Sequence, residues 1–252
     1  MPRKARKRSN TGIYHIILRG INKQIIFQGN EDREYFIKKM TYYRKKIRFK
    51  VYAYCLMDNH IHIIIDEKNE GIDNIVKRIS SSYVYYYNKK YERCGHLFQE
   101  RYKSEPVEEE RYFAVLVRYI HQNPVKAGIV KNAFQYRWSS YEEYLNKEKL
   151  IDCKFYLEML DNNEEKARKK YKEFMNEKNK DECLEYDSNV GITDVEAIKE
   201  IKNRLGEEII ENINQMSIKE QKEVLKEIKK IKEIGIRQIV RITGISLGIA
   251  RQ

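Results

Sequence analysis

The order of local patterns in the first half of the chain is the feature that most restricts its fold. Runs rich in β-branched and aromatic residues predict four strands, at residues 12–18, 49–56, 60–66 and 96–107. Apolar residues three or four positions apart predict three amphipathic helices, at residues 31–48, 72–91 and 108–123. Met57-Asp58-Asn59 predicts a turn between the middle two strands, and Pro124 is expected to end the third helix near Asn123.

This order of strands and helices predicts an α+β fold in which helices cover one face of an antiparallel sheet. The pattern changes after residue 150. Lys- and Glu-rich stretches without strand signals predict an all-α C-terminal region, with helices at residues 163–179, 194–205 and 217–234. We therefore expect two domains, residues 1–150 and residues 151–252.

The positive charge of the chain lies in its first part. Residues 1–150 contain 30 Lys and Arg against 17 Asp and Glu, whereas residues 151–252 contain 20 against 21. Such a field favours phosphate backbones, with anionic membranes as the alternative. No run of about 18 apolar residues occurs and no apolar stretch follows the basic N-terminus, so we expect a soluble protein in the cytoplasm, associated with the nucleoid. The four cysteines form no C-x-x-C pair, which argues against a zinc ribbon or a redox motif.

His60-Ile61-His62 lies inside a predicted strand. Side chains alternate between the faces of a strand, so both imidazoles project from one side. Two ring nitrogens can then reach one cation, and Mg²⁺ or Mn²⁺ would require an oxygen ligand as well. Taken alone, the pair fits two solvent-facing strand histidines equally well.

The third predicted helix presents a second pair of polar side chains. If its core stripe is Phe113, Leu116, Val117 and Ile120, then Tyr119 and Asn123 lie four residues apart on a neighbouring face. A phenol is a weak nucleophile unless it is deprotonated or directed at a phosphate whose charge a metal neutralises. Alone, Tyr119 is more often a packing residue and Asn123 a helix-terminating one. The combination with two histidines favours phosphodiester chemistry.

Two motifs resemble those of the single-tyrosine HUH transposases. Met57-Asp58-Asn59-His60-Ile61-His62 is similar to their His-hydrophobic-His motif, and residues 118–128, RYIHQNPVKAG, closely resemble the tyrosine helix of the REP-associated branch. Weaker likenesses occur at His15 with Arg19-Gly20, at residues 97–104, and at Trp138-Ser139-Ser140-Tyr141. The resemblance covers residues 8–145.

The resemblance implies a ferredoxin-like HUH domain that cleaves and rejoins single-stranded DNA near hairpins, as a metal-dependent endonuclease and transposase. Tyr119 would be the nucleophile that forms a 5′-phosphotyrosine and releases a 3′-hydroxyl. His60, His62 and Asn123 would hold Mg²⁺ or Mn²⁺. The partner would be single-stranded or hairpin DNA and not a membrane, and the enzyme would act as a monomer or homodimer.

Basic side chains at three places are candidate DNA contacts. A solvated tail is an equally good reading of the N-terminal arm, whereas the residues on or beside the sheet are better placed to grip DNA. The candidates of the arm and the sheet are Arg3, Lys4, Arg6, Lys7, Arg8, Arg19, Arg101 and Lys103.

Residues 235–250 resemble a helix-turn-helix with Thr243-Gly244-Ile245-Ser246 as its turn. The second helix would have only about six residues before Gln252. Arg237 and Arg241 are candidate phosphate contacts there, and an amphipathic helix pair that packs on the rest of the chain is the alternative.

Three functions are compatible with these features. The first is an active or domesticated single-strand DNA transposase. The second is a non-catalytic DNA-hairpin or operator-binding protein derived from such a transposase. The third is a metal-dependent hydrolase that uses water as its nucleophile, whose products would carry no protein-linked DNA.

Overall fold

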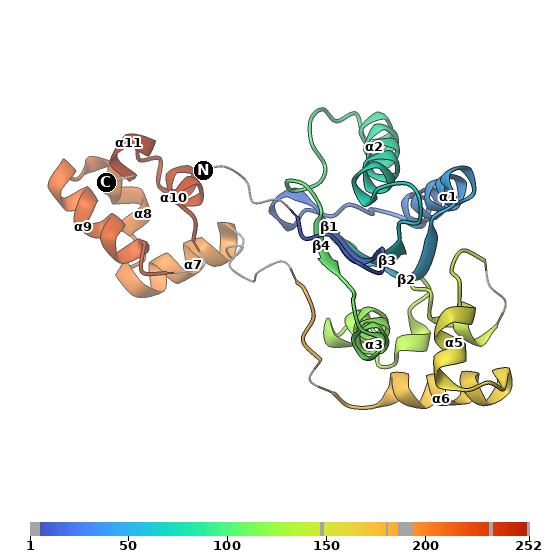
Figure 1. The fold of residues 1–252 in the computed structure, drawn as a ribbon. Coiled ribbons are helices and arrows are strands. Elements are labelled where there is room, and N and C mark those ends of the chain that lie inside the picture. Colours follow the sequence, from blue (N-terminus) through green and yellow to red (C-terminus); the bar gives the residue numbers. More distant parts are fainter. Residues whose placement is uncertain (1–5, 147–148, 180, 186–193, 232–233, 251–252) are drawn as a thin grey trace. The chain divides into compact units, whose positions relative to one another are not determined.

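The computed structural model describes residues 6–146, 149–179, 181–185, 194–231 and 234–250 (Figure 1). The chain divides into two compact units, residues 1–186 and residues 187–252. Each unit has a buried apolar core of its own. None of the helices within the described ranges is both long and apolar enough to cross a membrane.

A four-stranded sheet forms the centre of the first unit, in the order β2-β3-β1-β4, and all neighbouring strands run antiparallel. The strands are β1 (Ile13–Arg19), β2 (Lys50–Leu56), β3 (His60–Asp66) and β4 (Lys103–Pro106). The predicted hairpin of β2 and β3 is confirmed. The fourth strand was predicted too long, since residues 96–102 make only the isolated bridge of Phe98 to Gly20. Glu100 has a φ of 52°, a left-handed conformation that interrupts an extended strand.

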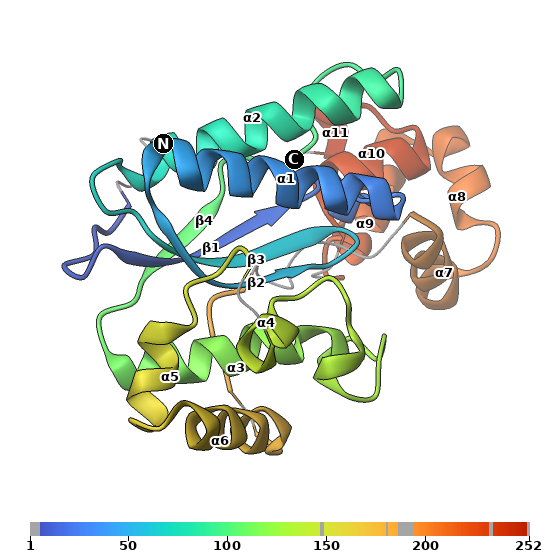
Figure 2. The ribbon, with the colours of Figure 1, turned by 90° about the vertical axis from the view of Figure 1, so that its right-hand side faces the viewer.

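Helices cover both faces of this sheet. The pair α1 (Asn30–Ile47) and α2 (Ile72–Lys90) lies on one face, and α3 (Glu110–Lys126) lies on the other (Figure 2). The α+β class is confirmed, but the expectation that helices cover one face was wrong. The reason lies in the strands: Ile61, Ile63 and Ile64 of β3 are all buried, so both faces of the strand are apolar.

The third helix does not stop at Pro124, contrary to the prediction. It continues to Lys126, and Pro124 is buried inside its last turn. Proline removes a single backbone donor, and so close to a helix end the loss affects only the final turn. The turn closes with a hydrogen bond of 2.9 Å from the Ala127 N–H to the Asn123 carbonyl.

The helices that follow α3 belong to the first unit. They are α4 (Tyr141–Leu145), α5 (Lys154–Leu160) and α6 (Glu164–Asn176). Tyr156 and Tyr171 are fully buried, and the ring of Tyr171 stacks on Tyr144 with 4.6 Å between the centroids. The boundary predicted at residue 150 therefore lies inside the first compact unit, which extends to residue 186.

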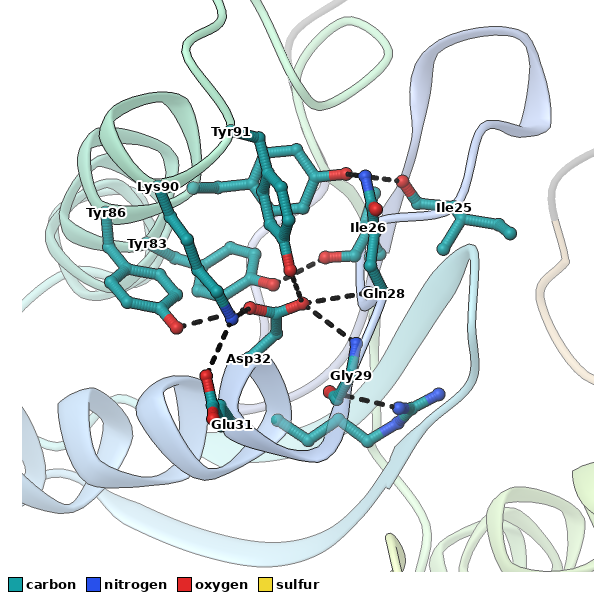
Figure 3. Close-up of polar contacts among 12 residues, drawn as sticks. Ile25, Ile26, Gln28, Gly29, Glu31, Asp32, Tyr83, Tyr86, Lys90 and Tyr91 are labelled. Atoms are coloured by element: carbon teal, nitrogen blue, oxygen red, sulfur yellow. Dashed lines mark hydrogen bonds and ion pairs between the residues drawn. The ribbon is translucent and has the colours of Figure 1, made fainter.

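Asp32 joins α1 to α2 through a buried network (Figure 3). Its carboxylate accepts hydrogen bonds from Lys90 Nζ and the Tyr91 hydroxyl, both at 2.8 Å, and from the Gly29 N–H at 3.0 Å. Burial raises the pKa of Asp32, but these bonds outweigh burial and lower it overall. The network fixes the N-terminus of α1 against the C-terminus of α2.

The second unit is all-helical among its described residues, as predicted for this region. Its helices are α7 (Asp194–Leu205), α8 (Ile209–Asn212), α9 (Ile218–Ile228), α10 (Ile236–Thr243) and α11 (Leu247–Ala250). Gly244 ends α10 with a φ of 72°, which favours glycine. Short 3₁₀ helices also occur, at Ile21–Lys23 (η1) and Ala133–Gln135 (η2) in the first unit and at Ile213–Gln215 (η3) in this one.

Candidate active site

His60 and His62 lie on the same face of β3, as the strand alternation predicted. They pair with Arg19 and Ile17 of the central strand β1, so the two imidazoles lie over the middle of the sheet. Their ring centroids are 5.0 Å apart and the rings are nearly perpendicular. His62 is almost fully buried, and His60 is half-buried.

A neighbouring amide orients the His60 ring. His60 Nδ1 lies 2.6 Å from Asn59 Oδ1, while the amide nitrogen of Asn59 donates to the Lys23 carbonyl at 3.3 Å. An amide oxygen only accepts, so the proton must be on His60 Nδ1. The lone pair of His60 Nε2 is then available as a ligand.

His15 plays the same part for His62. Its Nε2 atom lies 3.0 Å from His62 Nδ1, and the two rings stack with 5.2 Å between their centroids. The tautomer in which His62 Nδ1 donates leaves the His62 Nε2 lone pair open. Sequence reasoning noted His15 but gave it no role. The contact joins side chains 47 positions apart, so it depends on the pairing of β1 with β3.

All three histidines are neutral at physiological pH. Burial lowers the pKa of His15 to about 3. Burial, followed by the charge of Arg19, lowers the pKa of His60 to about 4. Burial also holds the pKa of His62 far below its usual range, with His15 and His60 adding to the effect. Neutral imidazole is the form that binds a metal ion.

Tyr119 and Asn123 of α3 face these histidines. The Tyr119 ring lies 5.7 Å from the His62 ring, edge to face, and 6.3 Å from that of His15. Asn123 donates from its amide nitrogen to the Tyr119 carbonyl at 2.9 Å, which leaves its amide oxygen free to act as a ligand. The predicted core stripe is confirmed, and Tyr119 is buried beside it, only 1% exposed.

A cleft of about 290 Å³ brings the predicted residues together. His60, His62 and Asn123 line it, together with Arg19, Lys126 and Glu185. Among the described residues, no three His, Cys, Asp or Glu side chains gather closely enough to hold a metal ion. The expected set is of another kind, two histidines and an amide. Each member is held by a partner in an orientation that leaves one lone pair open, so these residues fit a divalent ion.

Glu185 is a residue of the cleft that sequence reasoning missed. Its carboxylate accepts a hydrogen bond from the Tyr119 hydroxyl. Burial, and then the hydrogen bond and negative charge of Glu185, raise the pKa of Tyr119. Glu185 stands in a charged segment without a recognisable motif, so the sequence carried no signal for this contact.

Glycine at position 20 allows a close approach beside the cleft. A Cβ atom there would lie 2.3 Å from the Gln24 carbonyl oxygen and 2.8 Å from the side chain of Ile26. The Gly20 N–H donates to the Asn59 carbonyl at 2.9 Å. The end of β1 is thereby fixed to the residue that precedes His60.

The predicted DNA contacts of the first unit fall into two places. Arg6, Lys7, Arg8 and Arg101 line one groove of about 610 Å³. Arg6 forms an ion pair there with Asp73 at 2.5 Å. Arg19 lines the active-site cleft, and Lys103 donates to the Glu185 carbonyl at 3.2 Å.

The remaining candidates are less informative. Arg3 and Lys4 lie outside the described residues. Arg237 and Arg241 lie on α10 in the second unit, where Arg241 is exposed. The helix pair predicted at residues 235–250 is present as α10 and α11, and α11 has only four residues.

Comparison with known proteins identifies the class to which this site belongs. Residues 9–123 match the protein family described as "Transposase IS200 like". No curated protein matches the sequence. Through this domain the chain belongs to the IS200-like transposase family, and the expected kinship with the single-tyrosine transposases is confirmed.

Two solved structures resemble the chain. One is a REP-associated tyrosine transposase bound to a REP hairpin; it is 17% identical with a TM-score of 0.50, and the match covers 61% of this chain and 93% of that one. At this identity the likeness concerns the fold. The other is a candidate transposase from Deinococcus radiodurans R1, 16% identical with a TM-score of 0.34, covering 48% of this chain and 97% of that one.

Proposed function

We propose that this protein cleaves and rejoins single-stranded DNA near hairpins through a phosphotyrosine at Tyr119. The observation that carries the proposal is the position of Tyr119, whose ring lies 5.7 Å from His62 beside a cleft lined by His60, His62 and Asn123. Membership of the IS200-like family supports transposition as the process. Such an enzyme works on chromosomal DNA, and therefore in the cytoplasm at the nucleoid.

Strand cleavage is a transfer of the phosphoryl group to the tyrosine. The Tyr119 hydroxyl oxygen forms a bond to the phosphorus atom and gives up its proton, while the bond from phosphorus to the 3′ oxygen breaks. That oxygen takes up a proton and becomes a free 3′-hydroxyl. The phosphotyrosine retains the energy of the phosphodiester, so attack by a 3′-hydroxyl rejoins DNA without an external energy source.

His60, His62 and Asn123 would hold a divalent ion, Mg²⁺ or Mn²⁺. When bound, the ion would neutralise phosphate charge and polarise the phosphorus, which a neutral phenol requires. Asn59 and His15 keep the two imidazoles in the ligand tautomer. Lys126, whose ammonium lies 4.6 Å from the centre of the Tyr119 ring, favours the phenolate electrostatically.

DNA would be held by the basic groove and the cleft. The groove of Arg6, Lys7, Arg8 and Arg101 suits a phosphate backbone, and the neighbouring structure was solved with a REP hairpin. Arg19 lies in the cleft itself and is placed to contact phosphates next to the scissile one.

A non-catalytic DNA-binding protein is the second candidate. The observation in its favour is that Tyr119 is 1% exposed and its hydroxyl is bound to Glu185, which leaves the nucleophile covered. Under this alternative the fold would bind a DNA hairpin and make no covalent product.

Incubation with a hairpin-bearing oligonucleotide and Mn²⁺ separates the two. The transposase should give a protein-DNA adduct that survives denaturing electrophoresis, and Tyr119→Phe and His60→Ala should abolish it. Tyr42→Phe is the matched control, because Tyr42 is 51% exposed and lies on α1, away from the site. An adduct that persists in Tyr119→Phe contradicts the proposal, and so does the absence of any adduct over a range of hairpin sequences.

A further inference from the structure

The segment from Glu177 to Glu185, here called the strap, runs along α3; residue 180 within it is not among those described. Arg118 anchors it with a bidentate contact to Asp181, at 2.8 Å from Nε and 3.0 Å from Nη2. The remaining nitrogen of Arg118 donates to Glu177 at 2.7 Å. Arg118 is only 7% exposed, so this charge-assisted pair is shielded from solvent.

The same face of α3 holds the strap at two further positions. Gln122 accepts a hydrogen bond from the Asn179 amide at 2.7 Å, and Lys126 donates to the Asp181 carbonyl at 3.0 Å. Arg118, Gln122 and Lys126 are spaced four residues apart, so they form one row along the helix. The strap therefore lies on the helix that carries the nucleophile.

The strap ends at the reactive atom. Glu185 accepts the proton of the Tyr119 hydroxyl in a hydrogen bond and lines the cleft with His60, His62 and Asn123. A scissile phosphate must reach bonding distance of that hydroxyl oxygen from within the same cleft. Carboxylate and phosphate are both anions, so the two exclude each other by volume and by charge.

We propose that the strap is an autoinhibitory device that imitates the anionic backbone of the substrate, and that single-stranded DNA displaces it to reach Tyr119. Its acidic side chains occupy Arg118 and the tyrosine as phosphates would. The described contacts that hold it are mainly polar, and Glu177 and Glu185 are exposed, which is typical of segments that open locally without unfolding the core. This inference rests on the proposed function of Tyr119.

Two variants of the full chain release the strap without touching its covered partners. Glu185→Gln removes the charge at the tyrosine, and Asp181→Asn weakens the anchor on Arg118. Glu182→Gln is the matched control, because Glu182 is an exposed neighbour and its substitution changes the net charge equally. If the open form makes up about a tenth of the molecules, the first two variants should form the Mn²⁺-dependent adduct about tenfold faster at limiting oligonucleotide. The control should match the unmodified protein.

Hydrogen exchange of the strap gives a readout that needs no chemistry. In full-length Tyr119→Phe, addition of a hairpin oligonucleotide with a single-stranded flank should speed amide exchange in residues 181–185. Exchange that stays unchanged on saturation with the oligonucleotide overturns the proposal. So does adduct formation that is unchanged or slower in both Glu185→Gln and Asp181→Asn.

These failures differ from failure of the proposed function. If Tyr119→Phe still forms the adduct, Tyr119 is not the nucleophile, whatever the strap does. If the adduct depends on Tyr119 but the strap variants are no faster, only the strap proposal fails.

Discussion

The Nε2 atom of His15 lies 3.0 Å from the Nδ1 atom of His62, in the buried centre of the sheet. One histidine comes from β1 and the other from β3, so the pairing of the two central strands sets the contact. The contact turns the Nε2 atom of His62 toward the cleft. In this way the fold itself supplies the outer partner of a metal-ligating histidine.

His15→Phe should therefore weaken Mn²⁺ binding while keeping the volume of the side chain. Loss of an outer partner of a ligating histidine typically lowers metal affinity about 10- to 100-fold. Isothermal titration of the purified protein with MnCl₂ measures the change. His96→Phe, at an exposed position outside the cleft, is the control and should leave the affinity unchanged. Equal affinities of His15→Phe and the unmodified protein would refute this role for His15.

Acidification should destabilise the protein through His121. This residue is fully buried between the Ser140 hydroxyl at 2.8 Å and the Tyr171 hydroxyl at 3.0 Å, and burial lowers its pKa to about 3. Below pH 6.5 the unfolded chain takes up a proton that the folded protein refuses, so stability falls as the pH drops from about 6.5 toward 3.

Urea unfolding at pH 7 and pH 5 measures this contribution. His121→Gln should lose about 2 kcal/mol less stability between the two pH values than the unmodified protein, because it lacks the shifted group. His96→Gln should keep the full pH dependence, since His96 is exposed. An unchanged pH dependence in His121→Gln would show that His121 titrates normally.

Asp32 should contribute more to stability than its neighbour Glu31, although both bind Lys90. Asp32 is 0% exposed and caps the start of α1, whereas the side chain of Glu31 is 79% exposed. Asp32→Asn should reduce the free energy of unfolding by about 2 kcal/mol, and Glu31→Gln by less than about 0.5 kcal/mol. Denaturant titration compares them directly, and equal effects would contradict the account of Figure 3.

The first compact unit should fold without the second. A chain of residues 1–186 retains Tyr156, Tyr171 and Met175 in its core, whereas a chain that ends at residue 150 loses all three. We expect the former to unfold cooperatively on heating, as a complete domain does, and the latter to aggregate or unfold without a transition. Calorimetry of the two chains decides, and a cooperative transition in the shorter one would restore the boundary at residue 150.

Local sequence patterns account for much of this fold. The alternation in residues 60–66 and the spacing of Phe113, Leu116 and Ile120 each depend on near neighbours, and the structure has these elements as expected. The turn before His60 and the residues Tyr119 and Asn123 carried a family motif, so they too could be found in advance.

Other features depend on tertiary contacts that no local pattern encodes. Pro124 remains inside α3 because the helix ends shortly afterwards, and Tyr156 and Tyr171 become core residues only where they meet the face of α3. The contact of His15 with His62 requires strand pairing, and that of Glu185 with Tyr119 joins residues 66 positions apart.

Mass spectrometry of the protein-DNA adduct tests the central claim most directly. The protein would be incubated with a hairpin oligonucleotide and Mn²⁺, digested with nuclease and protease, and searched for a peptide with a nucleotide 5′-phosphate on tyrosine. The account predicts that the modified residue is Tyr119. A nucleotide on an exposed tyrosine such as Tyr85, with Tyr119 unmodified, would contradict it.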